Sequence, residues 1–504
     1  MFITLISPPT VHSFDSEFFV GRRGGPPLNL GYLSAALERA GIPHDVIDAM
    51  AYDETVVTPL LHFKLKGMPP EEIVARIDPR SKVVGIASMF TCEWLVVREL
   101  ARMIKTRFPD VILIIGGEHA TAAADSIIRF EKDIDYCFLG EADETLVEFV
   151  KALPEGRQGE TPGIVRRAGE GGIVTNPRPR RIRELDSLVP RWDQIPVDYY
   201  LSRKLSYSRL GHRAMPILAT RGCPYLCTFC TNEQMWGGRY VKRSVDSVIS
   251  EMLRYRQQHG VEHFDFLDLS TAIDRKWFKE LLERMIRDLP GISWEMTVGT
   301  RAEILDREIL TLLKRSGTKS VCYAPETGSA SMAAKVKKKL DHARLYRSVA
   351  DAVDLGFDVK ANVILGFPGE TFRELAQTLW MVLRLGASGV KGVSVFKFTP
   401  YFGSALGDEL GYRELTAERY EQVIQEFNGV AGARVFNLFA VLREPREQMY
   451  AFLSNSFMVA SFLLSAVRRP SYLIELWRNV RGRSPECAFE VAVFYLLKRY
   501  GVMS

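Results

Sequence analysis

The amino-acid sequence predicts an α/β protein made of two successive β/α units and a helical C-terminal region. Apolar strand patterns and amphipathic helix patterns alternate through residues 1–150, and the alternation resumes at Met215 and repeats six times before residue 400. No strand pattern of comparable quality occurs in residues 401–504. Because such alternation is typical of parallel sheets flanked by helices, we expect a doubly wound sheet first and a partial βα barrel second.

Each element of the first unit follows from its local pattern. A short apolar strand opens the chain, and residues 28–40 carry apolar side chains at helical spacing until Gly41 ends the run. The chain continues with a strand in HDVIDA, a helix near residues 70–77, a strand in KVVGIASM, a helix in TCEWLVVRELARMIKTRF, a strand in VILIIGG and a strand turning into a helix in YCFLGEADETLVEFVKAL. A doubly wound sheet binds its ligand at the carboxyl ends of its strands.

Residues 151–212 join the two units. Their content of glycine, proline and arginine predicts a hairpin followed by a connecting segment. Six arginines fall between residues 166 and 183. We interpret them as part of a solvated linker, with a phosphate-binding patch as the alternative.

The second unit covers residues 213–400. Its strands are expected in MPILATRG, HFDFLDL, SWEMTVG, KSVCYAP, VKANVILG and GVSVFKF, with helical patterns between them. In a βα barrel, the loops at the carboxyl ends of such strands carry the chemistry.

The C-terminal region, residues 401–504, is expected to be helical. Within it, residues 452–467 are strongly apolar, but this run is shorter than the roughly 20 residues that span a bilayer. We interpret it as a buried helix, with a surface for a membrane or a lipid-like substrate as the alternative.

Composition narrows the class of protein. The chain has 504 residues, and its 66 Lys and Arg exceed its 61 Asp and Glu by only five, which does not indicate nucleic-acid binding. The N-terminus lacks a basic stretch followed by a long apolar one, so we expect no secretory signal and a cytoplasmic location. Seven cysteines, an odd number, exclude a disulfide scaffold.

Three of the seven cysteines lie close together in TRGCPYLCTFC. Cys223, Cys227 and Cys230 follow the first strand of the second unit. Three thiolates on one loop can hold three irons of a 4Fe–4S cluster and leave the fourth iron open to an external ligand. Structural zinc normally requires a second cysteine pair, and none exists here. We therefore predict a 4Fe–4S cluster, shielded from water by Tyr225 and Phe229.

This C-x3-C-x2-C motif resembles that of the radical S-adenosylmethionine (SAM) enzymes, and the resemblance covers residues 213–400. It implies that SAM chelates the open iron and is cleaved to a 5′-deoxyadenosyl radical by an electron from the cluster. An electron donor such as flavodoxin or ferredoxin is implied as well. Tyr225 and Phe229 would also contact SAM.

The resemblance assigns three further segments to SAM. YAPETG makes Glu326 the candidate for the SAM amino group, although Pro325 stands where the family usually has glycine. Arg301 occupies the place of a family arginine near SAM. In VILGFPGET, Gly366 and Pro368 would let the backbone pass close to the adenine or ribose. The alternative for Glu326 is a surface or helix-capping role, and the alternative for Arg301 is a solvent-exposed salt bridge. The alternative for Gly366 and Pro368 is a simple tight turn.

The first unit resembles the cobalamin-binding module of one large radical SAM class. The matching pieces are PPLNLGYLSAALERAG, VIDA, VVGIASMFT, LIIGGEHAT and CFLGEADETL. They imply a cobalamin site whose residues follow successive strands, with tight turns as the alternative explanation of the small residues: Ser88, Thr91, Gly116, Gly117, Glu118, His119, Gly140 and Glu141.

The D-x-H-x-x-G pattern that carries a cobalt-ligating histidine is absent. We therefore predict cobalamin without a protein histidine on cobalt, with His119 as the alternative ligand. A transfer-RNA methylthiotransferase is excluded, because its second cluster needs three cysteines before residue 215 and only Cys92 and Cys137 are present.

Together these features predict a cobalamin-dependent radical SAM enzyme. The leading hypothesis is a methyltransferase acting on an unactivated carbon of a small metabolite, and the apolar C-terminal helices favour a hydrophobic one. The alternatives are a cyclase, oxidase or rearrangement enzyme with the same cofactors, and a cobalamin sensor with an inactive barrel.

Overall fold

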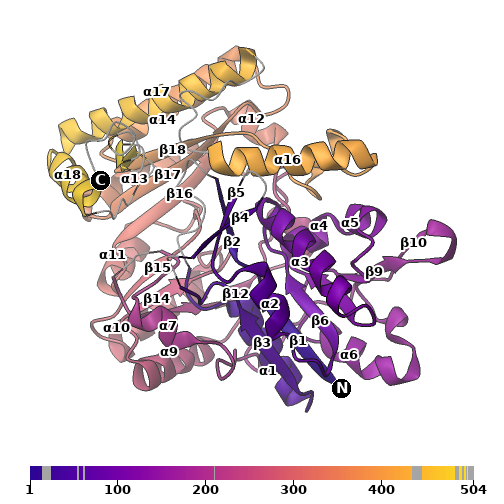
Figure 1. The fold of residues 1–504 in the computed structure, drawn as a ribbon. Coiled ribbons are helices and arrows are strands. Elements are labelled where there is room, and N and C mark those ends of the chain that lie inside the picture. The colour runs from indigo at the N-terminus through magenta and orange to yellow at the C-terminus, as the bar shows by residue number, and fades with distance from the viewer. Residues whose placement is uncertain are drawn as a thin grey trace. The chain divides into compact units, whose positions relative to one another are not determined.

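The computed structural model describes most of the chain (Figure 1), namely residues 1–13, 24–53, 56–60, 63–208, 211–433, 445–482, 487, 489–490, 493–494 and 497. Contacts divide the chain into two compact units. The first comprises Met1–Leu205, Arg221–Arg243 and Pro400–Gly432, and the second comprises Ser206–Thr220, Ser244–Thr399 and Ala433–Ser504. Residues Arg221–Arg243, the cysteine segment, thus belong to the first unit, although they follow the first strand of the barrel in the chain.

A seven-stranded sheet forms the centre of the first unit, in the order β10-β9-β8-β7-β6-β1-β3. Its parallel strands are β1 (Phe2–Ser7), β3 (His44–Asp48), β6 (Ser81–Ala87), β7 (Ile112–Gly116) and β8 (Tyr136–Phe138). The antiparallel hairpin of β9 (Ile164–Arg167) and β10 (Ile173–Thr175) extends one edge. The prediction of a doubly wound sheet is confirmed, because the parallel strands follow the flavodoxin-like order.

The helices of the first unit contribute, together with the strands, to its hydrophobic core. They are α1 (Leu28–Arg39), α2 (Pro70–Arg76), α3 (Trp94–Arg107), α4 (Glu118–Ala122), α5 (Ala124–Phe130), α6 (Thr145–Ala152), α7 (Val197–Ser202), α8 (Asn232–Trp236), α15 (Ala405–Glu409) and α16 (Ala417–Ala433). Helix α3 buries Trp94, Val97 and Leu100 at helical spacing. The same core includes Tyr420 and Ile424 of α16, so residues 400–432 complete the first unit.

The first unit also contains a small antiparallel sheet that the sequence pattern does not predict. It consists of β2 (Thr10–Ser13), β5 (Phe63–Lys66) and β4 (Val57–Leu60). Each strand has four residues. Strands this short contain too few positions for a period-two pattern to stand out from the surrounding loop.

Six parallel strands form the second unit. One sheet contains β11 (Ala214–Ile217), β14 (His263–Phe266) and β15 (Ser293–Met296), and the other contains β16 (Ser320–Glu326), β17 (Asp358–Leu365) and β18 (Gly392–Lys397). Parallel bridges from Trp294 to Thr318 and from Thr300 to Tyr323 connect the two sheets. A short ribbon, β12 (Thr220–Arg221) with β13 (Val241–Lys242), brackets the cysteines. The predicted partial barrel is confirmed.

The helices of the barrel begin where the sequence provides a side-chain cap. They are α9 (Val245–His259), α10 (Arg275–Asp288), α11 (Arg307–Arg315), α12 (Ala330–Lys335), α13 (His342–Asp354) and α14 (Phe372–Ala387). Each is preceded by a Ser, Thr or Asp whose side chain accepts a hydrogen bond from the backbone N–H three residues on. Such caps satisfy amide donors that the first helical turn leaves without partners.

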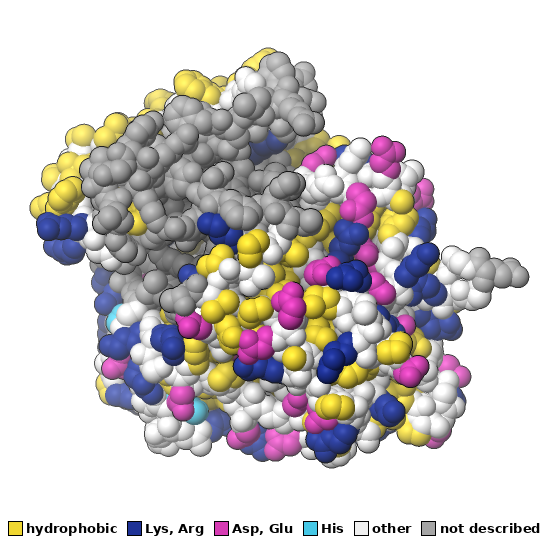
Figure 2. Space-filling view, viewed as in Figure 1, with side chains coloured by type: hydrophobic (Ala, Val, Ile, Leu, Met, Phe, Trp, Pro, Cys, Tyr) yellow, Lys and Arg dark blue, Asp and Glu magenta, His cyan; other side chains and the backbone are white. Residues whose placement is uncertain are grey.

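The apolar C-terminal run lies in α17 (Pro445–Arg468), which α18 (Ser471–Arg481) follows. Helix α17 packs on α14 so closely that a Cβ on Gly386 would lie 2.4 Å from the carbonyl oxygen of Ser461. The opposite face is exposed, and Figure 2 shows apolar side chains along it, with Phe452 70% and Val467 82% exposed. The predicted buried helix is therefore buried on one face only.

Within the described part of the chain, one helix, Gln448–Arg468, has the length and composition to cross a membrane. Helices that pack on a protein core meet the same criterion, and α17 packs on α14 and β18. One helix of this length and composition is weak evidence for a membrane span, so membrane association is not supported.

Candidate active site

The three cysteines lie on a compact turn at the start of the cysteine segment. Gly222 makes this turn with φ +83°, and a Cβ there would lie 2.1 Å from the carbonyl oxygen of Arg239. The amide of Asn232 donates hydrogen bonds to the carbonyl oxygens of Cys223 (2.8 Å) and Tyr225 (3.1 Å). The backbone N–H of Cys230 donates to the carbonyl of Cys227 (3.0 Å). The side chain of Asn232 and a backbone hydrogen bond thus hold the turn on which the three thiols lie.

The donor set of this turn fits an iron–sulfur cluster. None of the three cysteines forms a disulfide. Cys223 and Cys227 are half-buried, and Cys230 is exposed. No group of three His, Cys, Asp or Glu side chains among the described residues is arranged to hold a single metal ion. A 4Fe–4S cluster does not require that arrangement, because each thiolate binds a different iron.

The cysteine segment packs against the carboxyl edge of the first sheet. The hydroxyl of Thr231 donates to the carboxylate of Glu118, and the hydroxyl of Thr121 contacts the sulfur of Met235 at 3.5 Å. A Cβ on Gly140 would lie 3.1 Å from the carbonyl oxygen of Met235. Two of the predicted cobalamin-site residues therefore lie directly against the segment that carries the cysteines.

All eight residues predicted for the cobalamin site lie at this edge of the sheet. They follow three adjacent strands: Ser88 and Thr91 follow β6, Gly116 to His119 end or follow β7, and Gly140 and Glu141 follow β8. Gly117 has φ +123°, and a Cβ there would lie 2.5 Å from the carbonyl oxygen of Ser88. A tight turn therefore suffices to explain this glycine.

Two buried polar atoms at this edge have no hydrogen-bond partner in the described structure. They are the hydroxyl oxygen of Ser88 and Nε2 of His119. Unpaired buried polar atoms are uncommon in proteins and often mark a missing ligand or water. The donor chemistry of this edge therefore fits a polar ligand such as the nucleotide tail of cobalamin.

His119 is otherwise part of the protein core. Its side chain is 2% exposed, its Nδ1 lies 3.0 Å from the hydroxyl of Thr91, and its ring lies between Trp94 and Phe402, at centroid distances of 4.9 and 5.7 Å. Burial lowers the pKa of His119 to about 3, so the imidazole is neutral at physiological pH.

The interpretation of the linker arginines as solvated is wrong for Arg166, Arg167 and Arg181, which are half-buried, whereas Arg178 is exposed. Arg178 donates to the side chain of Gln234 at 3.1 Å, and Arg181 donates to the carbonyl of Trp236 at 3.2 Å. Arg166 and Arg167 donate to backbone carbonyls at 3.2 and 2.7 Å. These guanidinium groups hold loops and the cysteine segment in place, which a sequence pattern of exposed-looking arginines does not reveal.

In the second unit, Glu326 ends β16 in an unusual conformation. Its φ is +66°, a region that residues other than glycine rarely adopt and that often marks a functional site. Its carboxylate lies 3.2 Å from Nζ of Lys338, and the Glu326 side chain is only 12% exposed. Glu326 is therefore neither a surface residue nor a helix cap.

Arg301 and Gly366 lie at the same end of the barrel strands as Glu326. Arg301 follows β15 and pairs with Glu303 at 2.8 Å, and the side chains are 9% and 30% exposed, so the ion pair is partly exposed to solvent. Gly366 follows β17 with φ +81°, and a Cβ there would lie 3.2 Å from the ring of Tyr450. Its N–H donates to the carboxylate of Glu370 (2.7 Å), and Pro368 lies in the same turn.

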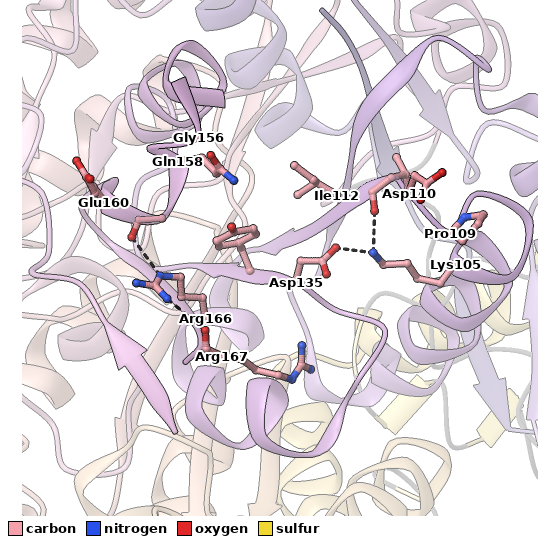
Figure 3. Close-up of a pocket in the computed structure, with 13 residues that line it drawn as sticks. Lys105, Pro109, Asp110, Ile112, Asp135, Gly156, Gln158, Glu160, Arg166 and Arg167 are labelled. Carbon is pink, nitrogen blue, oxygen red and sulfur yellow. Dashed lines mark hydrogen bonds and ion pairs between the residues drawn. The ribbon is translucent and has the colours of Figure 1, made fainter. Parts of the chain in front are cut away.

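A cavity of about 620 Å³ lies at the opposite edge of the first sheet, at the amino ends of β7 and β8 (Figure 3). Most of its charged side chains have partners, whereas the side-chain oxygen of Gln158 has no hydrogen-bond partner among the described residues. Lys105 pairs with Asp135 at 2.7 Å, and Arg166 donates to the carbonyls of Gly159 and Arg167. Since it also lies away from the carboxyl ends of the strands, this cavity is not the candidate site.

Two family models match the sequence. Residues 23–150 match the B12 binding domain, and residues 217–381 match the Radical SAM superfamily. The two matches fall on the two successive β/α repeats of the chain.

Curated relatives cover most of the chain. Cytidylyl-2-hydroxyethylphosphonate methyltransferase of Streptomyces wedmorensis is 28% identical, over 75% of this chain and 77% of that protein. The anaerobic magnesium-protoporphyrin IX monomethyl ester cyclase of Rubrivivax gelatinosus is 26% identical, over 80% of this chain and 69% of that protein.

Two solved structures share the fold. One is the radical S-adenosylmethionine methyltransferase TsrM from Kitasatospora setae, with tryptophan substrate and a SAM analogue bound. It matches with a TM-score of 0.63 at 19% identity, over 82% of this chain and 76% of that chain. The other is the cobalamin-dependent S-adenosylmethionine radical enzyme OxsB, with a TM-score of 0.61 at 16% identity, over 84% of this chain and 56% of that chain.

Proposed function

Because the chain belongs to the cobalamin-binding radical SAM enzymes, we propose that it is a methyltransferase acting on an unactivated carbon of a small molecule. When bound, the cluster with SAM supplies a radical that removes a hydrogen atom, and methylcobalamin supplies the methyl group. The observation that carries the proposal is the packing of the cysteine segment on the carboxyl edge of the first sheet, where Ser88 and His119 keep unpartnered polar atoms.

In this proposal, the chain binds and positions the cofactors. Cys223, Cys227 and Cys230 hold three irons, and the carboxylate of Glu326 accepts hydrogen bonds from the SAM amino group. Five further residues surround SAM and eight form the cobalamin edge. The SAM residues are Tyr225, Phe229, Arg301, Gly366 and Pro368; the cobalamin residues are Ser88, Thr91, Gly116, Gly117, Glu118, His119, Gly140 and Glu141.

The proposal requires an electron donor of the flavodoxin or ferredoxin type. The protein must also exclude water, since a substrate radical and a reduced cluster are both readily diverted by side reactions. The half-buried Tyr225 and Phe229 within the cysteine turn support this role.

The test is isotope transfer from SAM that carries a deuterated methyl group. The reconstituted protein is incubated anaerobically with cobalamin, reductant, labelled SAM and a metabolite extract, and the products are analysed by mass spectrometry. We expect one labelled methyl group in a product, with formation of 5′-deoxyadenosine. 5′-Deoxyadenosine without label transfer would instead support the cyclase-type alternative, for which the similarity to the Rubrivivax gelatinosus cyclase is the supporting observation. If the reconstituted protein cleaved no SAM, the result would support the alternative that it is a cobalamin sensor with an inactive barrel.

We expect His119→Ala to leave the absorption spectrum of bound cobalamin unchanged, because the neutral imidazole is buried beside Thr91, Trp94 and Phe402. The cavity that the substitution creates should lower the free energy of unfolding by about 2–4 kcal/mol. Spectra of the wild type and the variant, recorded with excess cobalamin, check this result. A change in axial ligation would assign Nε2 of His119 to cobalt instead.

A further inference from the structure

A buried ion-pair network joins the cysteine segment to the end of strand β8. Arg221 stands two residues before Cys223 and is 5% exposed. Its guanidinium donates to both carboxylate oxygens of Asp143, at 2.9 and 3.1 Å, and to Glu141 at 3.0 Å. It also stacks over the ring of Tyr32, at 4.7 Å from the centroid.

The network holds the far end of the cysteine turn as well. The second carboxylate oxygen of Glu141 pairs with Arg181 at 2.9 Å. The guanidinium of Arg181 lies 4.9 Å from the ring centroid of Trp236, the last residue of α8, and donates to its carbonyl. Glu141 therefore contacts, through two arginines, both the entry to the turn and the helix that follows it.

Both partners of the central pair stay charged. Burial would raise the pKa of Asp143, but attraction to Arg221 and its hydrogen bonds lower that pKa below the ordinary value. Removing one member would leave an uncompensated buried charge.

An ionic network is an inefficient way to gain stability alone. Well-packed apolar residues of similar volume often stabilise a core as much as or more than a buried ion pair does. The two parallel hydrogen bonds of a guanidinium and a carboxylate do, however, fix direction and register. This geometry therefore suits a positioning role.

We propose that Arg221, Asp143 and Glu141 form a clamp that sets the position of the cysteine turn on the carboxyl edge of the first sheet. In this assignment they are positioning residues, and Glu141 leaves the cobalamin set proposed above, because its carboxylate acts on the cysteine segment. The clamp would keep the cluster at a constant place relative to the edge where Ser88 and His119 stand. The proposal rests on the cluster assignment made above but not on methyl transfer.

Hydrogen–deuterium exchange of the reconstituted protein tests the clamp. Arg221→Lys keeps the charge but loses the planar fork, and Asp143→Asn keeps the shape but loses the charge. We expect amide exchange in residues 221–243 to become at least about tenfold faster in both variants, as the loss of a charged hydrogen bond implies. Exchange in β6 and β7 and the iron content should stay unchanged. The matched control is Arg275→Lys, whose pairs with Asp306 and Glu308 are exposed.

The amount of 5′-deoxyadenosine formed per molecule of product provides a second readout. A misplaced cysteine turn should form more 5′-deoxyadenosine per molecule of product, whereas a general loss of stability would lower both in parallel. Unchanged exchange in residues 221–243, or faster exchange throughout the sheet, would overturn the proposal. Should Asp143→Asn fail to fold, Glu141→Gln takes its place.

A weaker affinity for cobalamin in Glu141→Gln, with normal exchange in the cysteine segment, would return Glu141 to the cobalamin site and also overturn the clamp. If the wild type cleaves no SAM, the proposed function fails, but the exchange experiment still decides on the clamp, because exchange does not depend on turnover.

Discussion

Replacing any one of Cys223, Cys227 and Cys230 with alanine should abolish SAM cleavage. Each thiolate binds a different iron, and the open fourth iron is available to SAM only while the other three are held. No further cysteine exists in the cysteine segment to replace a lost ligand. The measurements are 5′-deoxyadenosine formation by mass spectrometry, the iron and sulfide content, and the electron paramagnetic resonance spectrum of the reduced protein.

The matched control for this prediction is Cys92→Ala. Cys92 is a half-buried cysteine in the first unit, outside the turn, so its loss should leave iron content and SAM cleavage intact. Turnover retained in any of the three turn variants would reject the cluster assignment. Equal loss in Cys92→Ala would show instead that the assay reports general damage to the first unit.

Glu326→Gln should weaken SAM binding roughly 10- to 100-fold while leaving the iron content unchanged. This range corresponds to the loss of a hydrogen bond to a charged group, about 1.5–3 kcal/mol. The substitution keeps the shape of the side chain at the end of β16 but removes the charge that Lys338 faces. Equilibrium binding of SAM to the reconstituted, unreduced protein checks the result.

Two variants separate charge from backbone strain at this position. Glu326→Gly removes the carboxylate but accepts φ +66° without strain, so it should weaken SAM binding, while the relief of backbone strain offsets part of the stability lost with the partner of Lys338. The control is Glu308→Gln, which removes an acid on the surface of α11 that pairs with the exposed Arg275 and Lys279. We expect it to leave the affinity for SAM unchanged. An unchanged SAM affinity in both Glu326 variants would rule out the predicted role of Glu326.

The fold was largely predictable from local pattern. Helix α3 and strands β6 and β7 follow from apolar spacing over seven to eighteen residues, and the order of the parallel strands then follows from their alternation with helices. The strand ends predicted to carry the cobalamin residues are strand ends in the structure. What was missed, such as the sheet of β2, β4 and β5, consists of elements whose stability comes from pairing with strands distant in sequence.

The partners of the site residues were less predictable. Glu141 was expected to contact cobalamin, but its carboxylate pairs with Arg221 and Arg181. Asp143 and Arg221, 78 residues apart, were not predicted at all. In the sequence, these charged residues stand among small residues, in GEADE and in TRGCP. Nothing in the sequence shows that the two segments meet in the folded protein.

The class of cofactor thus follows from the local sequence, whereas the contacts of the site residues follow from the tertiary structure. The spacing of Cys223, Cys227 and Cys230 is local, and a thiolate binds iron wherever the loop places it, so the cofactor class follows from the amino-acid sequence. The grouping of these cysteines with the first sheet instead of the barrel depends on tertiary contacts. Arg221, Asp143 and the conformation of Glu326 likewise depend on residues that meet only in the folded protein, because long-range pairing has no periodic pattern in the chain.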